Sequence, residues 1–204
     1  LGFAIGDLQE AVRKDVEPHK LSIALARVVA RIFCVAEGIL SGKDLVDALA
    51  LKYPLGMCSY CQCAPCQCPE QRPEPKIRRV ANIEQRLDWG IDTWQSHLSS
   101  IYGIANRRRG LPHAIARLYK EATELQNLAM SLATFRSSER FRRELAFELA
   151  DTFAWTIAVA YLLTCDLERA VVDRYGSGCL TCKQPKECRC AHFNCAPVDW
   201  SKVP

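Results

Sequence analysis

Apolar residues recur at helical spacing along most of the chain. After Pro112, which suits the first turn of a helix, they recur at Ile115, Leu118, Ala122, Leu125, Ala129 and Leu132. Asp92 is a suitable N-cap for an earlier helix that runs to about Asn106. A third helix is expected to end near Leu163, and a short fourth to span residues 166–174. Because no stretch alternates convincingly outside the cysteine-rich segments, the pattern predicts an all-α protein.

Residues 21–40 and 145–165 are apolar and each long enough to cross a membrane. Their ionisable residues are Arg27, Arg31, Glu37, Glu148 and Asp151. Such residues are rare inside membrane spans, so we expect buried helices of a soluble bundle without membrane association. No stretch is typical of a signal peptide, which favours a cytoplasmic location.

Four carboxylates form two pairs with a spacing of three. These residues are Glu121, Glu124, Glu148 and Asp151. The spacing places each pair on one face of a helix. Acids on an apolar helix are costly to bury without compensation, and a bound divalent cation is the simplest compensation. Oxygen ligands from two facing helices suit Mg²⁺ or Mn²⁺.

Twelve cysteines occur in 204 residues, and most fall into two groups in which CxxC precedes CxC. This spacing predicts two structural zinc sites. The first comprises Cys58, Cys61, Cys66 and Cys68; the second comprises Cys179, Cys182, Cys188 and Cys190. Cys63, Cys195 and His192 are alternative ligands. A disulfide framework and an iron–sulfur cluster remain the other interpretations.

The two cysteine groups mark an internal repeat. Residues 24–31 align with 148–155, and residues 7–12 align with 124–129. In this alignment Arg27 stands where the second copy has Asp151, so the first copy has lost the proposed metal site.

Three domains or segments follow from the repeat. Residues 1–68 form a degenerate helical unit with a cysteine module, and residues 84–204 form the second unit with its module and a C-terminal tail. Residues 69–83 contain three prolines and many charges, which predicts an extended linker.

The acidic motifs resemble a known family. ExxE at Glu121 and Glu124, followed about two dozen residues later by ExxD at Glu148 and Asp151, is similar to the signature of the MazG-type all-α nucleotide pyrophosphohydrolases. The resemblance covers about residues 90–175, with an echo in residues 1–55. The family usually opens its motif with two adjacent glutamates, whereas this chain has Lys120 at the first position.

The resemblance implies Mg²⁺-dependent hydrolysis of nucleoside triphosphates to monophosphate and pyrophosphate, as in clearance of unwanted nucleotides. The four acids would hold the metal, and Glu121 or Glu124 would orient the attacking water. The segment from Trp94 to His97 resembles a substrate-facing helix, and Trp94 or Trp155 would stack on the base. The candidate phosphate ligands are Lys120, Arg140, Arg142 and Arg143. The plainer alternatives are an ion pair from Lys120 to Glu124 and a surface role for His97.

Family members pair, so the resemblance also implies an intrachain pseudo-dimer, with a further homodimer as an alternative. Arg27 and Arg31 would then supply charge to the neighbouring cleft. The net charge of +4 is mild, and we do not expect nucleic-acid binding. The rival hypothesis is a non-catalytic, zinc-stapled helical scaffold that binds a protein or nucleic acid.

Overall fold

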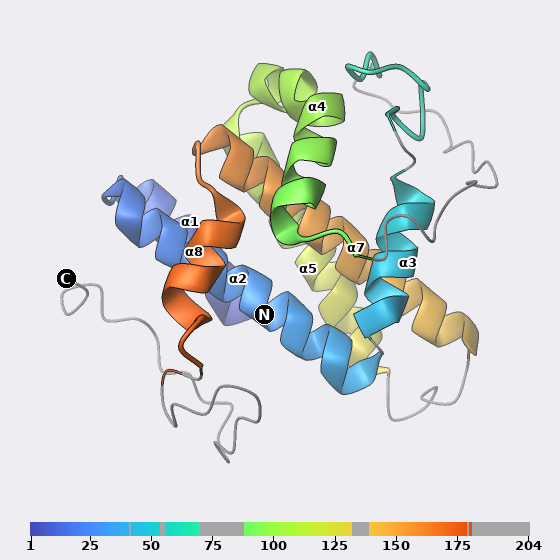
Figure 1. Ribbon diagram of the computed structural model, residues 1–204, viewed down its shortest axis with the longest axis horizontal. Coiled ribbons are helices and arrows are strands. Elements are labelled where there is room, and N and C mark those ends of the chain that lie inside the picture. The colour runs from blue at the N-terminus through green and yellow to red at the C-terminus, as the bar shows by residue number, and fades with distance from the viewer. Residues whose placement is uncertain (41, 54–55, 70–87, 132–138, 179, 181–204) are drawn as a thin grey trace.

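The computed structural model describes residues 1–40, 42–53, 56–69, 88–131, 139–178 and 180. Within these residues all regular elements are α-helices, so the predicted all-α class is confirmed (Figure 1). The helices are α1 (Gly2–Arg13), α2 (Pro18–Ile39), α3 (Gly42–Lys52), α4 (Ile91–Arg109), α5 (Leu111–Met130), α7 (Glu139–Leu162) and α8 (Leu167–Tyr175).

The helix ends follow local chemistry. Pro112 lies in the first turn of α5, as expected, because its missing N–H is not needed there. Gly110 separates α4 from α5 and has a φ of 81°, which a residue with a side chain rarely adopts. Asp166 caps α8 by accepting a 2.9 Å hydrogen bond from the backbone N–H of Arg169. The cap of α4 differs from the prediction: the cap position belongs to Gly90, and Asp92 lies inside the first turn.

Helix α7 lies at the centre of the bundle. It packs against α2, α3, α4 and α5, while α8 packs against α2 and α1 packs against α2 and α5 (Figure 1). The buried side chains of α1–α3 and of α4–α8 form one continuous hydrophobic core. The two predicted units therefore share their interior.

By length and composition α7 could cross a membrane, and it is the only such helix in the described part of the chain. However, 61% of its most apolar window is buried inside the bundle. Its buried hydroxyls are satisfied internally: Thr152 and Thr156 each donate a 2.8 Å hydrogen bond to the carbonyl four residues earlier. These features are typical of the central helix of a helical bundle.

An ion pair joins α1 to α2 near the core. Arg27 donates a 2.7 Å hydrogen bond to Asp7, and both side chains are at most about one-fifth exposed, at 10% and 19%. Arg27 is thus engaged within its own half of the chain. Removing one member of such a pair leaves the other as an uncompensated, poorly hydrated charge.

Replacing Arg27 with Met should therefore lower the free energy of unfolding by about 3–5 kcal/mol, measured by urea denaturation. The double variant Asp7→Leu/Arg27→Met should recover most of this loss. Arg13→Met, which removes only an exposed contact to Glu10, should change stability by less than ~0.5 kcal/mol. Equal effects of the Arg27 and Arg13 substitutions would show that the buried pair contributes nothing special.

Candidate metal centre and substrate cavity

Three of the four predicted acids converge where α5 meets α7. Oxygens of Glu121 and Glu124 on α5 and of Glu148 on α7 lie within 4.8 Å of one another. Glu121 is only 4% exposed. Among the described residues, Oε2 of Glu148 has no hydrogen-bond partner. Oε1 of Glu121 forms ion pairs with Arg117, at 2.7 Å, and with Lys120, at 3.8 Å. Buried carboxylate oxygens without donors are suited to a hard cation.

Burial and neighbouring charges shift the pKa values of the acids in this cluster. Burial raises the pKa of Glu121 to about 7, against the attraction of Arg117 and with a further push from Asp151. Burial also raises the pKa of Glu148. By contrast, a hydrogen bond from Lys120 lowers the pKa of Glu124. Without a cation, burial therefore makes both Glu121 and Glu148 harder to ionise than an exposed glutamate.

Asp151 lies one helical turn beyond Glu148 and is held by the end of α3. Lys52 forms an ion pair with one carboxylate oxygen of Asp151, and Tyr53 donates a 2.8 Å hydrogen bond to the other. Lys52 also donates to the carbonyl of Phe147, at 3.2 Å. The fourth acid is therefore tied to the N-terminal half of the chain.

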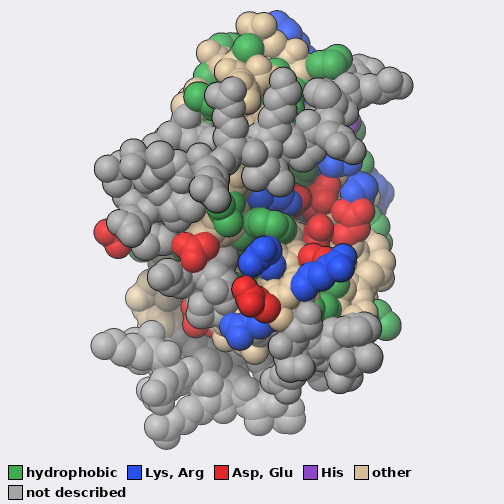
Figure 2. All heavy atoms as spheres, turned by 90° about the vertical axis from the view of Figure 1, so that its right-hand side faces the viewer, with side chains coloured by type: hydrophobic (Ala, Val, Ile, Leu, Met, Phe, Trp, Pro, Cys, Tyr) green, Lys and Arg blue, Asp and Glu red, His purple; other side chains and the backbone are tan. Residues whose placement is uncertain are grey.

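A cavity of about 570 Å³ opens beside the acids. Its charged lining residues are Lys52, Arg117, Glu121, Arg143 and Asp151, and its aromatic ones are Tyr53, Tyr60, Tyr102, Phe147, Trp155 and Tyr161. On the side of the bundle shown in Figure 2, acidic side chains lie next to lysine and arginine side chains around a small hydrophobic area. A cavity of this size and lining can hold a small anionic ligand with a flat ring.

The predicted substrate residues have different positions. Trp94 is buried, and with Trp89 and His97 it forms an aromatic cluster with ring centroids 4.9–5.9 Å apart, outside the cavity lining. Gln95 bridges to the α7–α8 turn through Cys165 and Leu167. This segment of α4 is therefore part of the packing between helices.

The predicted basic residues also divide. Lys120 pairs with Glu124 at 2.6 Å, the plainer alternative, and the 88% exposed side chain of Arg140 pairs with Glu144. Arg142 is exposed on α7. Arg143 lines the cavity and lies 3.3 Å from Glu139. Trp155 lines the cavity as well, with the Arg117 guanidinium 5.4 Å from its ring centroid.

Sequence reasoning missed Lys52, Tyr53 and Arg117 at this site. A signal existed for the first two, because a basic residue followed by tyrosine precedes both cysteine groups, at Lys52 and again at Arg174. Arg117 stands four residues before Glu121, the spacing of a helical ion pair.

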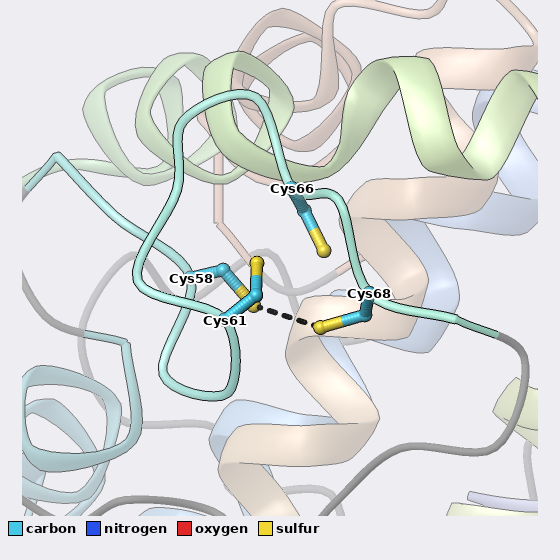
Figure 3. A group of neighbouring side chains, drawn as sticks. All are labelled: Cys58, Cys61, Cys66 and Cys68. Carbon is cyan, nitrogen blue, oxygen red and sulfur yellow. Dashed lines mark hydrogen bonds between the residues drawn. The ribbon is translucent and has the colours of Figure 1, made fainter.

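The first cysteine module forms a compact cluster of sulfurs. The four predicted residues have Sγ atoms within 4.8 Å of one another and point toward a common centre (Figure 3). Cys58 and Cys68 Sγ are 3.6 Å apart. Tetrahedral Zn–S bonds of about 2.3 Å require sulfurs about 3.8 Å apart. The cluster can thus bind a metal such as zinc, and Cys63 points its thiol to the carbonyl of Cys61 instead.

The cysteines that the structure describes are free thiols, which does not favour the disulfide interpretation for the first module. Backbone amides stabilise the sulfurs: the N–H groups of Tyr60 and Gln67 donate to Cys58 and Cys61 at 3.4 and 3.3 Å. The isolated Cys34 and Cys165 lie on or beside the helices. The second module, with Cys179, Cys182, Cys188, Cys190, His192 and Cys195, lies outside the described residues, as does linker segment 70–83.

Comparison with known proteins identifies no relative: no family model, no curated protein and no solved structure matches the chain.

The raised pKa of Glu121 predicts a pH-dependent stability. Below its unfolded-state pKa the acid is protonated in both states. Between about pH 4.5 and about pH 7 the folded protein holds the proton more tightly, so rising pH should lower the free energy of unfolding of the magnesium-free protein, by ~2 kcal/mol. Glu121→Gln should reduce this slope.

Urea denaturation in magnesium-free buffer at about pH 5 and about pH 7.5 measures this effect. Chelators are omitted so that zinc stays bound. Added Mg²⁺ should restore stability at the higher pH in the wild type and not in Glu121→Gln. Equal pH slopes in the two proteins would contradict the predicted proton on Glu121.

Proposed function

We propose that the chain is a Mg²⁺-dependent nucleoside triphosphate pyrophosphohydrolase that forms a nucleoside monophosphate and pyrophosphate. The observation that carries this proposal is the convergence of Glu121, Glu124 and Glu148 beside a cavity with cationic and aromatic walls. The donor set fits Mg²⁺, because it consists of carboxylates and one of its buried oxygens, Oε2 of Glu148, has no hydrogen-bond partner among the described residues.

Glu121, Glu124 and Glu148 would bind the cation, which when bound activates water and neutralises phosphate charge. One of these carboxylates would orient the attacking water and accept its proton. Attack at the α-phosphorus breaks the bond to the α–β bridging oxygen, and pyrophosphate leaves with that oxygen.

The cavity supplies groups for the rest of the substrate. Arg117, Arg143 and Lys52 offer positive charge for the triphosphate, and guanidinium groups match phosphate oxygens well. Trp155 and the cavity tyrosines offer faces on which a base can stack. Glu121 and Asp151 line the same cavity as these groups, and Glu124 and Glu148 lie next to Glu121.

Helix packing supports the proposed repeat. Suppose that α1, α2 and α3 of the first copy correspond to α5, α7 and α8 of the second. The contact between α1 and α2 then corresponds to the contact between α5 and α7, and the contact between α3 and α7 corresponds to the contact between α8 and α2. This is the pattern of an intrachain pseudo-dimer whose third helices are swapped. It also explains how Lys52 and Tyr53, from the first copy, reach the acids of the second.

The scaffold alternative rests on one observation. Lysines already neutralise two of the four acids, since Lys52 pairs with Asp151 and Lys120 with Glu124. A protein that never binds Mg²⁺ could keep its acids in this way. The hydrolase and scaffold hypotheses therefore differ in whether removing a magnesium ligand abolishes pyrophosphate release.

The direct test is pyrophosphate release from a panel of ribo- and deoxyribonucleoside triphosphates with Mg²⁺. Glu148→Gln should lower kcat/KM at least ~100-fold, because it removes a metal ligand that cannot be replaced by water alone. Glu144→Gln is the matched control, since Glu144 lies one turn earlier on α7, exposed and paired with Arg140. It should keep near wild-type activity. Absence of magnesium-dependent release from every nucleotide would favour the scaffold.

Lys52→Met tests the contribution of the first copy to the cavity. Loss of this charge should raise KM for the triphosphate about 10-fold or more, because the phosphate groups lose a partner. Lys14→Met, which removes an exposed lysine paired with Glu10, should leave KM unchanged. Steady-state kinetics distinguish the two, and an unchanged KM in Lys52→Met would mean that Lys52 serves only to hold Asp151.

A further inference from the structure

The first cysteine module forms a wall of the cavity. Five residues of the segment from Met57 to Gln62 line it: Met57, Cys58, Ser59, Tyr60 and Gln62. The opposite walls come from α4, α5 and α7. The segment that carries the sulfur ligands therefore also faces the space proposed for the substrate.

This wall is fixed to α4 and to itself. The backbone N–H of Cys66 donates a 2.7 Å hydrogen bond to the carbonyl of Ile101, and Cys58 is fully buried against Ile101 and Tyr102. Within the loop, the N–H of Gln62 donates to the carbonyl of Cys58 at 2.9 Å. A metal bound by the four sulfurs would tie these contacts together.

Gln62 occupies an unusual backbone conformation in this wall. Its φ is 59°, in the left-handed region that glycine adopts without cost and other residues adopt reluctantly. If the position served only the turn, glycine would be the better residue. Residues other than glycine that adopt the left-handed conformation cluster at functional sites, where the side chain has a role that glycine could not fill.

Gln62 presents one of the two side-chain amides in the cavity lining, and the other belongs to Asn106. Most of the lining away from the acids is aromatic or aliphatic, and the Gln62 amide makes no hydrogen bond to the described residues. An amide presents a donor and an acceptor side by side. That pair complements a nucleobase edge that offers one acceptor and one donor, whereas a carboxylate complements an edge with two donors.

We propose that the zinc-bound loop of Cys58, Cys61, Cys66 and Cys68 is the base-recognition element of the cavity, and that Gln62 selects the nucleobase by hydrogen bonding to its edge. This inference rests on the proposed function, which supplies the nucleotide, and adds the part of the chain that discriminates among nucleotides. Zinc bound by the four cysteines would then hold Gln62 in place for recognition as well as stabilise the local fold.

The test compares Gln62→Gly with Gln67→Gly in the full chain. Gln67 is an exposed residue of the same loop that does not line the cavity. Both variants should retain the zinc content of the wild type, and Gln62→Gly should be at least as stable, because it relieves the left-handed strain. Binding of non-hydrolysable triphosphates of each base is measured by calorimetry, and pyrophosphate release by kinetics.

Gln62→Gly should lose about tenfold of the wild-type preference among bases, while Gln67→Gly keeps it. Gln62→Glu should shift the preference toward guanine, which offers two adjacent donors. A wild-type base ranking retained in both Gln62 variants overturns the inference, even if pyrophosphate is released.

Other outcomes separate the two proposals. Nucleotide binding whose base preference depends on Gln62, without pyrophosphate release, supports the recognition loop and contradicts the hydrolase. No binding of any nucleotide by the zinc-loaded wild type overturns both. A Gln62→Gly variant with reduced zinc content and a matching loss of stability assigns Gln62 a structural role and overturns its role in recognition.

Discussion

The burial of carboxylates between α5 and α7 is the constraint on which the rest of the site depends. Glu121 and Glu148 lie on helices whose other inward residues are mostly apolar, so their charge must be neutralised by protons, by cations of the chain or by a metal. The surrounding positive groups come from three helices: Lys52 from α3, Arg117 from α5 and Arg143 from α7. None of them satisfies Oε2 of Glu148. A purely structural arrangement would gain by replacing that acid with an apolar residue, whereas a metal site requires it.

The two halves of the proposed repeat neutralise their buried acids in different ways. Asp7 and Arg27 occupy the positions that align with Glu124 and Asp151, and they neutralise each other across α1 and α2. An arginine at this position leaves no need for a cation. The first copy thereby gains an internally neutral core, and its remaining contribution to the cavity is made by Lys52 and Tyr53 at the end of α3. A packed partner without a metal site is therefore still needed to complete the neighbouring cavity.

Local periodicity predicted the elements well and their contacts poorly. The ends of α4, α5, α7 and α8 lie within three residues of the predicted ones, because the spacing of apolar positions sets which face of each helix is buried. The spacing of Glu121 and Glu124, and that of the first cysteines, also predicted neighbours, since both motifs are short. Lys52 meets Asp151 only through the packing of α3 on α7, 99 residues away, and no local pattern encodes that pairing. For the same reason Trp94, a large apolar side chain on the inner face of α4, packs in the interior, outside the cavity lining.

The sulfur cluster explains how the cavity can include a strained glutamine. A left-handed conformation costs a residue with a side chain about 1–2 kcal/mol, and a short loop between helices has few apolar contacts with which to offset that cost. If zinc binds the four thiolates, it would contribute about 10–16 kcal/mol of folding free energy, far more than the strain at Gln62. The hydrogen bond from Cys66 to Ile101 holds the loop against α4. Metal binding that stabilises the loop would therefore also hold the cavity-lining residues of the loop in place. In the proposed enzyme, the rigid helices would supply the acids for catalysis. The metal-bound loop would supply a cavity wall in which residues could be substituted to suit a different nucleotide without disturbing the core.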